Sequence, residues 1–198
     1  MNKNKKIGVI GGMGPQASAK FYELLIKKSI DRYGVAKNED CPNIFMHSVP
    51  VPDFILNPDY LPISRSILIE SVKTLNMAGV SSICIACNTA HLLIPDLRKN
   101  SSVPVVSIIE EVAKFIEEKQ YKRVGLLSSS MTKTTGLYDR INNQNVRLFT
   151  LPKADQKTVS SIIFVVIAGK SGKTEVGLLK TIAQKFVSKQ KLDALILG

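Results

Sequence analysis

The sequence predicts an α/β protein built from two similar half-domains, each with a parallel β-sheet. Short β-branched runs alternate with segments of helical periodicity along the whole chain, which is the pattern of parallel sheets covered by helices. The predicted strands are almost continuously apolar, as expected when both faces of a sheet are covered. In addition, residues 5–10 (KKIGVI) are echoed by residues 122–127 (KRVGLL), and a small-residue turn and a helix follow each run.

The first half-domain is expected to span residues 1–103. It opens with a strand and a glycine-rich turn, after which apolar residues recur at helical spacing. A later helix is expected to end at Gly79, because glycine readily adopts the left-handed conformation that closes a helix. The expected strands are residues 6–10, 43–49 and 82–86, and the expected helices are residues 16–33, residues 64–78 and a short helix within residues 88–99.

The second half-domain is expected to span residues 104–198, with a polar turn at residues 128–134. Residues 79–86 are echoed by residues 191–197, so the counterpart of Cys87 would fall directly after Gly198. If the repeat extends to this position, the second half-domain is expected to be truncated at its last strand. Its expected strands are residues 105–107, 123–127, 146–151 and 192–197, and its expected helices are residues 109–119, 135–142, 154–168 and 173–189.

The composition favours a cytoplasmic globular protein. The net charge is +11, from 27 Lys and Arg against 16 Asp and Glu. Because the lysines are spread along the chain, without an arginine cluster or interleaved aromatics, a solvated surface is favoured over a nucleic-acid interface. A positive protein also attracts acidic substrates. The N-terminus lacks the apolar core of a signal peptide, and no apolar run is long enough to cross a bilayer, so no membrane partner is expected.

The three cysteines, Cys41, Cys84 and Cys87, are too few for a disulfide framework. The last two have the C-x-x-C spacing of redox and zinc sites. A redox pair would open a helix, whereas these two lie in a strand-like run, and a zinc ion would need two further ligands. We therefore expect no metal, and we interpret Cys84 as a small core residue.

The glycine-rich turn formed by residues 11–17 (GGMGPQA) follows a strand and opens a helix. It satisfies the dinucleotide fingerprint G-x-G-x-x-G/A, and a helix N-terminus there would present N–H groups to an anion. The fingerprint also requires an acidic residue at the end of the second strand, and that strand ends in His47-Ser48 instead. We favour a carboxylate-binding turn, with a dinucleotide site as the alternative.

Cys87 follows a predicted strand, and ligands of parallel α/β folds bind at the carboxyl ends of strands. A thiol becomes a base or nucleophile when nearby cations or helix N-termini lower its pKa. A buried core thiol is the alternative, but the polar residues Asn88 and Thr89 directly after Cys87 favour a functional site. His91 could orient the thiol or cap the next helix, and we favour the capping role.

Two polar tracts in the second half are weaker candidates. Residues 128–132 (SSSMT) are the counterpart of the glycine-rich turn and could bind a second carboxylate, although ordinary turn chemistry explains such residues equally well. Residues 169–174 (GKSGKT) end like a phosphate-binding loop. The full motif requires glycine at position 167, where this sequence has isoleucine, so no nucleotide site is predicted there.

Together these motifs resemble the aspartate/glutamate racemase family, and its aspartate racemase branch in particular. The resemblance covers the whole chain. It is carried by residues 7–15 (IGVIGGMGP), 86–91 (ACNTAH), 103–108 (VPVVSI), 136–138 (GLY) and 194–198 (ALILG). It implies two similar α/β domains with the active site between them, no cofactor such as pyridoxal phosphate, no metal, and a homodimer.

The resemblance also implies a mechanism in which two cysteines face the substrate α-carbon from opposite sides. Cys87 would be one acid–base cysteine. Met13, Asn88, Thr89 and Thr132 would bind a small acidic amino acid, most simply aspartate, and Lys170 is a candidate for its side-chain carboxylate. The family continues its last strand into a second cysteine.

This sequence ends before that cysteine, at Leu197-Gly198, so we expect impaired racemisation by the chain as written. A non-catalytic protein that binds amino acids or dicarboxylates is the alternative.

Overall fold

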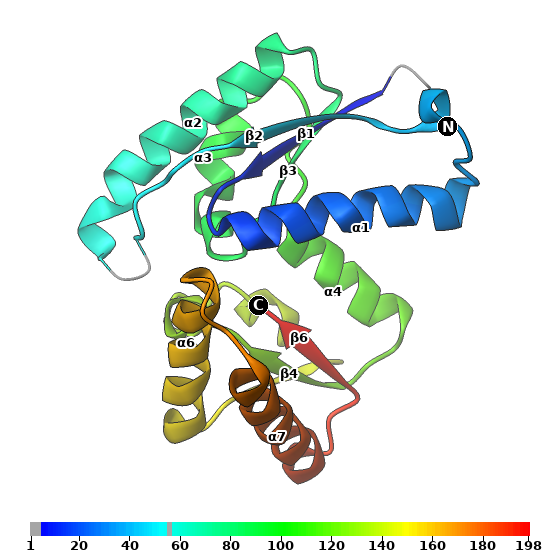
Figure 1. The fold of residues 1–198 in the computed structure, drawn as a ribbon. Helices are drawn as coiled ribbons and strands as arrows, with labels where there is room; N and C mark the ends of the chain where they lie inside the picture. Colours follow the sequence, from blue (N-terminus) through cyan, green and yellow to red (C-terminus); the bar gives the residue numbers. More distant parts are fainter. Residues whose placement is uncertain (1–4, 55–56) are drawn as a thin grey trace. The chain divides into compact units, whose positions relative to one another are not determined.

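The computed structural model describes residues 5–54 and 57–198, and the chain divides into two compact units, Met1–Ile108 and Ile109–Gly198 (Figure 1). The boundary lies after Ile108 rather than after residue 103. Val105 makes a parallel bridge to Ile83, and the N–H of Ile108 donates to the ring of His91. These contacts attach the connecting segment to the first unit. The strand expected at residues 105–107 is reduced to the single bridge between Val105 and Ile83.

The first unit contains a three-stranded parallel sheet with β1 in the centre. Its strands are β1 (Lys6–Gly11), β2 (Asn43–Ser48) and β3 (Ser82–Ile85), in the order β2-β1-β3. The register pairs Ile10 with His47 on one side and with Ile85 on the other. Ile10 is fully buried, which explains why the central strand is an apolar run.

Helices lie on both faces of this sheet (Figure 1). A Cβ atom added to Gly8 would touch Leu75, whereas one added to Gly11 would touch Ser18. Because Gly8 and Gly11 are three positions apart on one strand, they face opposite sides. The helices α2 (Leu61–Met77) and α3 (Ile94–Lys99) therefore share one face and one apolar core, and α1 (Pro15–Tyr33) lies on the other face.

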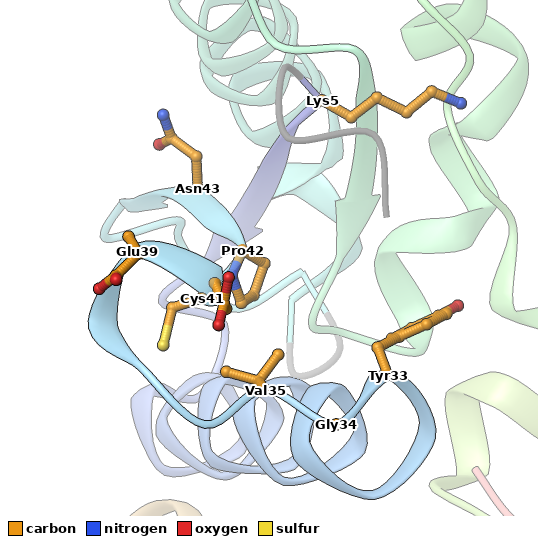
Figure 2. Close-up of a pocket in the computed structure, with 9 residues that line it drawn as sticks. Lys5, Tyr33, Gly34, Val35, Glu39, Cys41, Pro42 and Asn43 are labelled. Atoms are coloured by element: carbon orange, nitrogen blue, oxygen red, sulfur yellow. The ribbon is translucent and has the colours of Figure 1, made fainter.

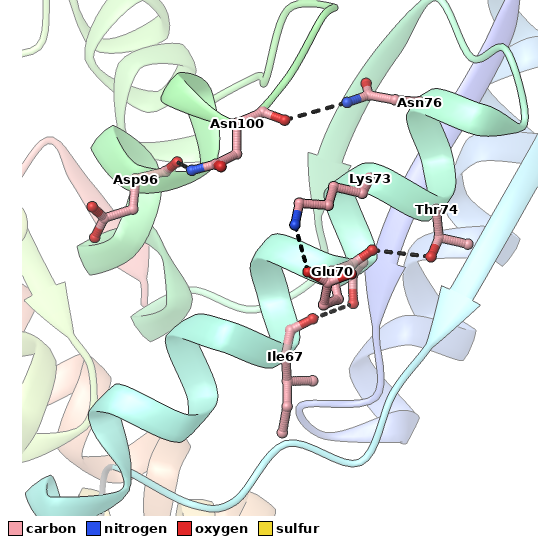
Figure 3. A network of polar contacts seen from close by, with 8 residues as sticks. Ile67, Glu70, Lys73, Thr74, Asn76, Asp96 and Asn100 are labelled. Atoms are coloured by element: carbon pink, nitrogen blue, oxygen red, sulfur yellow. Dashed lines mark hydrogen bonds and ion pairs between the residues drawn. The ribbon is translucent and has the colours of Figure 1, made fainter.

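Polar contacts join α2 to α3 and support the strand-to-helix segment between them (Figure 3). The Asn76 side chain donates to the backbone oxygen of Asn100 at 3.3 Å, and Asn100 in turn donates to the backbone oxygen of Asp96 at 2.8 Å. Arg65 and Asp96 form an ion pair at 3.0 Å. The segment between α2 and α3 carries Cys87. The described part of the unit also contains short 3₁₀ helices at Asn38–Asp40, Pro58–Tyr60 and Thr89–Leu93.

The second unit repeats the topology of the first. Its strands are β4 (Arg123–Leu127), β5 (Arg147–Thr150) and β6 (Ala194–Leu197), in the parallel order β5-β4-β6. β4 takes the central place of β1 and β6 the place of β3, which confirms the predicted internal repeat. The Asp193 carboxylate accepts the N–H groups of Lys122 and Arg123, both at 2.8 Å. These bonds lower the pKa of Asp193 and fix the start of β4.

The helix α5 of the second unit begins five residues before the helix that the sequence predicted at residues 135–142. The helices are α4 (Ile108–Glu118), α5 (Ser130–Thr134), α6 (Lys153–Ile167) and α7 (Lys173–Gln190), with a short 3₁₀ helix at Asp139–Ile141. The turn expected at residues 128–134 contains α5, because the Ser129 hydroxyl accepts the Thr132 N–H and caps a helix. Gly136, with φ of +65°, interrupts the helix expected at residues 135–142.

Candidate active site

The glycine-rich turn and Cys87 leave the first sheet at the same edge. They follow β1 and β3, which are paired and parallel. The Ala86 N–H donates to the backbone oxygen of Ile10 at 2.8 Å, so Cys87 comes directly after the last paired residue. Met13 and Cys87 are half-buried, and both pack against the core beneath this edge. The structure therefore brings two of the predicted site residues to one end of the sheet.

The environment of Cys87 acts on its thiol in two opposite directions. Burial is the largest effect and raises the pKa of the thiol, because it disfavours the charged thiolate. Hydrogen bonds from the backbone N–H groups of Ala90 and Thr89 lower the pKa, and the nearby carboxylate of Asp53 raises it. The net pKa is raised, so the resting group is a protonated thiol, and two N–H donors are positioned to stabilise it after it ionises.

Asp53 is not among the site residues predicted from the sequence. It lies in the loop after β2, and its charge acts on Cys87 from a distant part of the sequence. The strand order contains the signal that could have identified it. Because β2 and β3 flank β1 in a parallel sheet, the loops that follow all three strands emerge at one edge. A charged residue in the loop after β2 is therefore a natural neighbour of Cys87.

Asn88, Thr89 and His91 continue the chain from Cys87 into a 3₁₀ helix. Thr89 and His91 are buried, and Asn88 is half-buried. The His91 N–H donates to the Asn88 oxygen at 3.1 Å, and Nδ1 of His91 lies 2.8 Å from the Cys87 oxygen. His91 therefore contacts the backbone of Cys87. It also caps a helix, as expected, but that helix is α4 rather than the adjacent α3.

The glycine-rich turn is shaped by close backbone packing. Gly12 has φ of +94°, and a Cβ atom there would lie 2.3 Å from the backbone oxygen of Val49. The Gly12 N–H donates to the Ser18 hydroxyl at 2.9 Å, so this N–H is engaged within the protein. Gly14 and Pro15 then start α1, where the missing N–H of proline costs nothing. Close packing against Val49 therefore explains why position 12 is a glycine, and no bound nucleotide is needed to explain it.

Thr132 lies near the corresponding edge of the second sheet. It is buried in α5, and its hydroxyl lies 3.1 Å from that of Ser129. At the same edge, the Gly198 N–H donates to the Leu127 oxygen at 2.7 Å, just as Ala86 bonds to Ile10 in the first sheet. Gly198 therefore occupies in the second sheet the position that Ala86, the residue before Cys87, occupies in the first.

Lys170 lies in the exposed segment between α6 and α7. Its N–H donates to the Val165 oxygen at 3.0 Å and continues the end of α6. Gly172, two residues later, donates its N–H to the Glu175 carboxylate at 2.7 Å and starts α7. The segment that resembled a phosphate-binding loop is thus a helix-to-helix connection. Within the described residues, no hydrogen bond or ion pair is found for the Lys170 side chain.

The described residues form neither a cluster of metal ligands nor a helix able to cross a membrane. Across residues 5–54 and 57–198, no group of three or more His, Cys, Asp or Glu side chains is arranged to hold a metal ion. Cys84 and Cys87 are free thiols, and Cys84 donates weakly to the Gly8 oxygen at 3.4 Å. In the same residues, no helix has the length and apolar character needed to cross a membrane.

A model of the Asp/Glu/hydantoin racemase family matches residues 10–198 of this chain. The chain belongs to the Asp/Glu/hydantoin racemase family. The match begins inside β1 and includes both sheets, so it covers the glycine-rich turn, the Cys87 segment and the whole second unit. The two-unit α/β fold expected from the resemblance is confirmed.

Individual relatives support this membership. The broad specificity amino-acid racemase RacX of Bacillus subtilis (strain 168) is 31% identical over 70% of this chain, and the match spans 61% of RacX, less than two thirds of its length. An aspartate racemase homologue from Pyrococcus horikoshii OT3 is 28% identical, with a TM-score of 0.80 over 98% of this chain and 84% of that one. The aspartate racemase of Picrophilus torridus shares the fold, with 24% identity and a TM-score of 0.77 over 97% and 79% of the two chains.

Proposed function

We propose that this chain has the fold and first acid–base group of a racemase that acts on a small acidic amino acid, most simply aspartate, without pyridoxal phosphate. The observation that carries the proposal is the position of Cys87. Its thiol lies at the carboxyl edge of the first sheet, beside the glycine-rich turn, with the N–H groups of Thr89 and Ala90 directed at it. The Pyrococcus aspartate racemase homologue supports this choice of substrate, and RacX, a broad specificity amino-acid racemase, supports the choice of reaction.

In the proposed reaction, the Cys87 thiolate removes the α-proton from one face of the amino acid, and the electron pair remains on the α-carbon. A second acid on the opposite face then donates a proton, which inverts the centre. A single group that returned the same proton would retain the configuration, so two opposed groups are needed. The carbanion is stabilised by donors around its carboxylate. Met13, Asn88 and Thr89 are proposed for that role in the first unit, and Thr132 and Lys170 in the second.

The electrostatics of the site suit this chemistry. The raised pKa of Cys87 gives a strong base once the proton is lost, and the Thr89 and Ala90 N–H groups compensate for the developing charge. The net charge of +11 attracts an acidic substrate. We also propose that the protein is a cytoplasmic homodimer that binds neither nucleic acid nor a membrane.

The test is proton exchange at the α-carbon. A polypeptide of these 198 residues is incubated in D₂O with L-aspartate and, separately, with D-aspartate. NMR follows the loss of the α-proton signal, and chiral chromatography follows inversion. We expect exchange of one enantiomer without racemisation, because this polypeptide supplies one of the two acid–base groups, and we expect a Cys87→Ser variant to lose the exchange. Racemisation of both enantiomers by this polypeptide would refute the two-cysteine mechanism.

A second candidate is a protein of the same fold that binds amino acids or dicarboxylates without catalysis. One observation favours it: burial keeps the Cys87 thiol protonated. Calorimetric titration with aspartate separates the two functions. Equal affinity in the original chain and in Cys87→Ser, with exchange in neither, would support the binding protein and exclude the racemase.

A further inference from the structure

His91 is a buried histidine whose two ring nitrogens both contact the backbone of the first unit. Its Nε2 lies 3.0 Å from the Ile108 nitrogen. Its Nδ1 lies 2.8 Å from the Cys87 oxygen and 3.2 Å from the Asn88 oxygen. Because a backbone N–H can only donate, Nε2 is an acceptor, and the neutral ring carries its proton on Nδ1. The ring therefore donates to the carbonyl of the residue that carries the thiol.

The Cys87 oxygen lies where a 3₁₀ turn would use it as a backbone acceptor. In such a turn a carbonyl accepts the N–H three residues later, so the Cys87 oxygen would accept the Ala90 N–H. The 3₁₀ helix of this segment begins later, at Thr89, and its first backbone bond joins the His91 N–H to the Asn88 oxygen. At the Cys87 oxygen, the ring of His91 takes the place of the Ala90 N–H as donor.

The Ala90 N–H is directed at the Cys87 sulfur instead. Burial is the largest effect on this thiol and raises its pKa, whereas the N–H groups of Ala90 and Thr89 lower it. Ala90 is fully buried, and Thr89 and His91 are buried as well, so solvent has little access to these donors. Whether the Ala90 N–H bonds to the oxygen or to the sulfur of the same cysteine therefore affects how readily Cys87 ionises.

We propose that His91 is a positioning residue that keeps the Ala90 N–H directed at the Cys87 thiol. Its Nδ1–H occupies the Cys87 oxygen, which is the acceptor that would otherwise engage the Ala90 N–H in a 3₁₀ turn. The Ile108 N–H holds the ring proton on Nδ1, because Nε2 must stay free to accept. This role rests on the proposed function, in which Cys87 is the acid–base group, and His91 acts through the thiol rather than through the substrate.

Two substitutions separate the two ends of the ring. An asparagine amide reaches the position of Nδ1 and can still donate to the Cys87 oxygen, whereas a glutamine amide reaches the position of Nε2 and can still accept the Ile108 N–H. We expect His91→Asn to retain the reactivity of Cys87, and His91→Gln and His91→Leu to lose part of it. The Asp53 carboxylate, which adds to the effect of burial on the Cys87 pKa, is the same in every variant. Circular dichroism confirms that each variant is folded.

The pH profile of Cys87 alkylation is the first measurement. Iodoacetamide reacts with a Cys84→Ala chain, and mass spectrometry follows Cys41 and Cys87, which lie on separate tryptic peptides. We expect His91→Gln to slow Cys87 alkylation at pH 8 and to shift its pH profile toward higher pH, because the thiolate loses the Ala90 donor. We expect His91→Asn to keep the Cys87 profile of the parent chain.

Cys41 is the internal reference at the opposite end of the sheet. It is exposed and precedes β2, in a small pocket of about 210 Å³, whereas Cys87 follows β3 at the carboxyl edge. Figure 2 shows Cys41 in this pocket, in the segment that joins α1 to β2. A substitution at His91 that slows both thiols alike would act on the whole chain and would contradict a specific effect on Cys87.

Deuterium exchange at the α-carbon of aspartate is the second measurement. We expect His91→Gln to lower kcat with little change in KM, because the ring acts on the thiol and does not contact the substrate. His91→Asn should retain the kcat of the original chain. Absence of exchange in the original chain would refute the proposed function, and the alkylation profiles would still decide the role of His91.

NMR of the unsubstituted chain tests the same geometry even if a variant does not fold. The ¹⁵N signals of the His91 ring should show the proton on Nδ1, and the Ala90 amide signal should move with the ionisation of Cys87. Three results would overturn the proposal: a proton on Nε2, an Ala90 signal that does not respond, and equal pH profiles for His91→Asn and His91→Gln. Equal profiles would mean that His91 maintains the fold without directing the Ala90 N–H.

Discussion

The Nε2 atom of His91 accepts a hydrogen bond of 3.0 Å from the backbone N–H of Ile108, the first residue of α4. The other ring nitrogen, Nδ1, lies 2.8 Å from the backbone oxygen of Cys87. An acceptor at Nε2 and a donor at Nδ1 define a neutral ring with its proton on Nδ1. His91 therefore fixes the backbone that carries the thiol and ties it to the start of α4.

Replacement of His91 by phenylalanine should destabilise the first unit. The ring is buried, and the change leaves the Ile108 N–H and the Cys87 oxygen without this partner. Each such hydrogen bond contributes about 0.5–1.5 kcal/mol net, so urea unfolding should show a loss of roughly 1–3 kcal/mol. The control is the same substitution at His47, whose buried Nδ1 has no hydrogen-bond partner among the residues that the structure describes. A similar loss at both positions would contradict the bridging role.

The local parts of the fold were predictable because short-range patterns determine them. The alternation of strands and helices, the internal repeat and the position of Cys87 after β3 all follow from periodicity and turn residues. The prediction of a helix at residues 135–142 was wrong because the Ser129 hydroxyl starts α5 earlier. Gly136 then interrupts the segment. Such competition between adjacent caps depends on backbone geometry that periodicity does not describe.

Long-range contacts were the part that the sequence did not reveal. A capping role was predicted for His91, but its partner Ile108 lies 17 residues away and no local pattern connects them. The effect of Asp53 on Cys87 likewise requires the strand order β2-β1-β3 before the two loops can be placed together. Residue types at strand ends therefore predict the candidate site, whereas its electrostatics require the tertiary structure.

A Gly12→Ala change should disrupt the turn between β1 and α1. An alanine Cβ atom would lie 2.3 Å from the Val49 oxygen, and the positive φ is unfavourable for any residue with a side chain. We expect a loss of more than about 3 kcal/mol in unfolding free energy, because backbone atoms on both sides must move. Gly177→Ala is the matched control.

Gly177 lies in α7, and an added Cβ atom would meet nothing within 4 Å, so alanine there should stabilise the protein by about 0.5–1 kcal/mol. If the two alanine variants unfold at the same urea concentration, close packing does not explain why position 12 is a glycine.

Cys84 should make the protein less stable at alkaline pH. Burial raises the pKa of Cys84 from 9.0 to about 12. Below about pH 9 the thiol is protonated in both the folded and the unfolded chain. As pH rises toward 12 the unfolded chain ionises first, so the contribution of this group to stability is lost across that window.

Between pH 8 and pH 10 the Cys84 contribution should fall by about 1 kcal/mol. Urea unfolding at both pH values should show that Cys84→Ala reduces the pH dependence by this amount. Cys41→Ala, which removes an exposed thiol, is the control. An unaltered pH dependence in Cys84→Ala would show that this thiol ionises alike in the folded and unfolded chains.

Removal of the Asp53 charge should make Cys87 more reactive. The carboxylate raises the pKa of the Cys87 thiol in addition to the larger effect of burial, so Asp53→Asn should lower that pKa and increase the thiolate fraction at any given pH. In a background with Cys41 and Cys84 replaced by alanine, iodoacetamide can modify only Cys87. We expect Asp53→Asn to increase the alkylation rate at pH 8 and to shift the pH profile toward lower pH. Asp59→Asn removes an exposed charge near the start of α2 and should leave both measurements unchanged. A faster reaction without a shift of the pH profile would instead mean that the substitution opened access to the thiol, and that the Asp53 charge does not act on its ionisation.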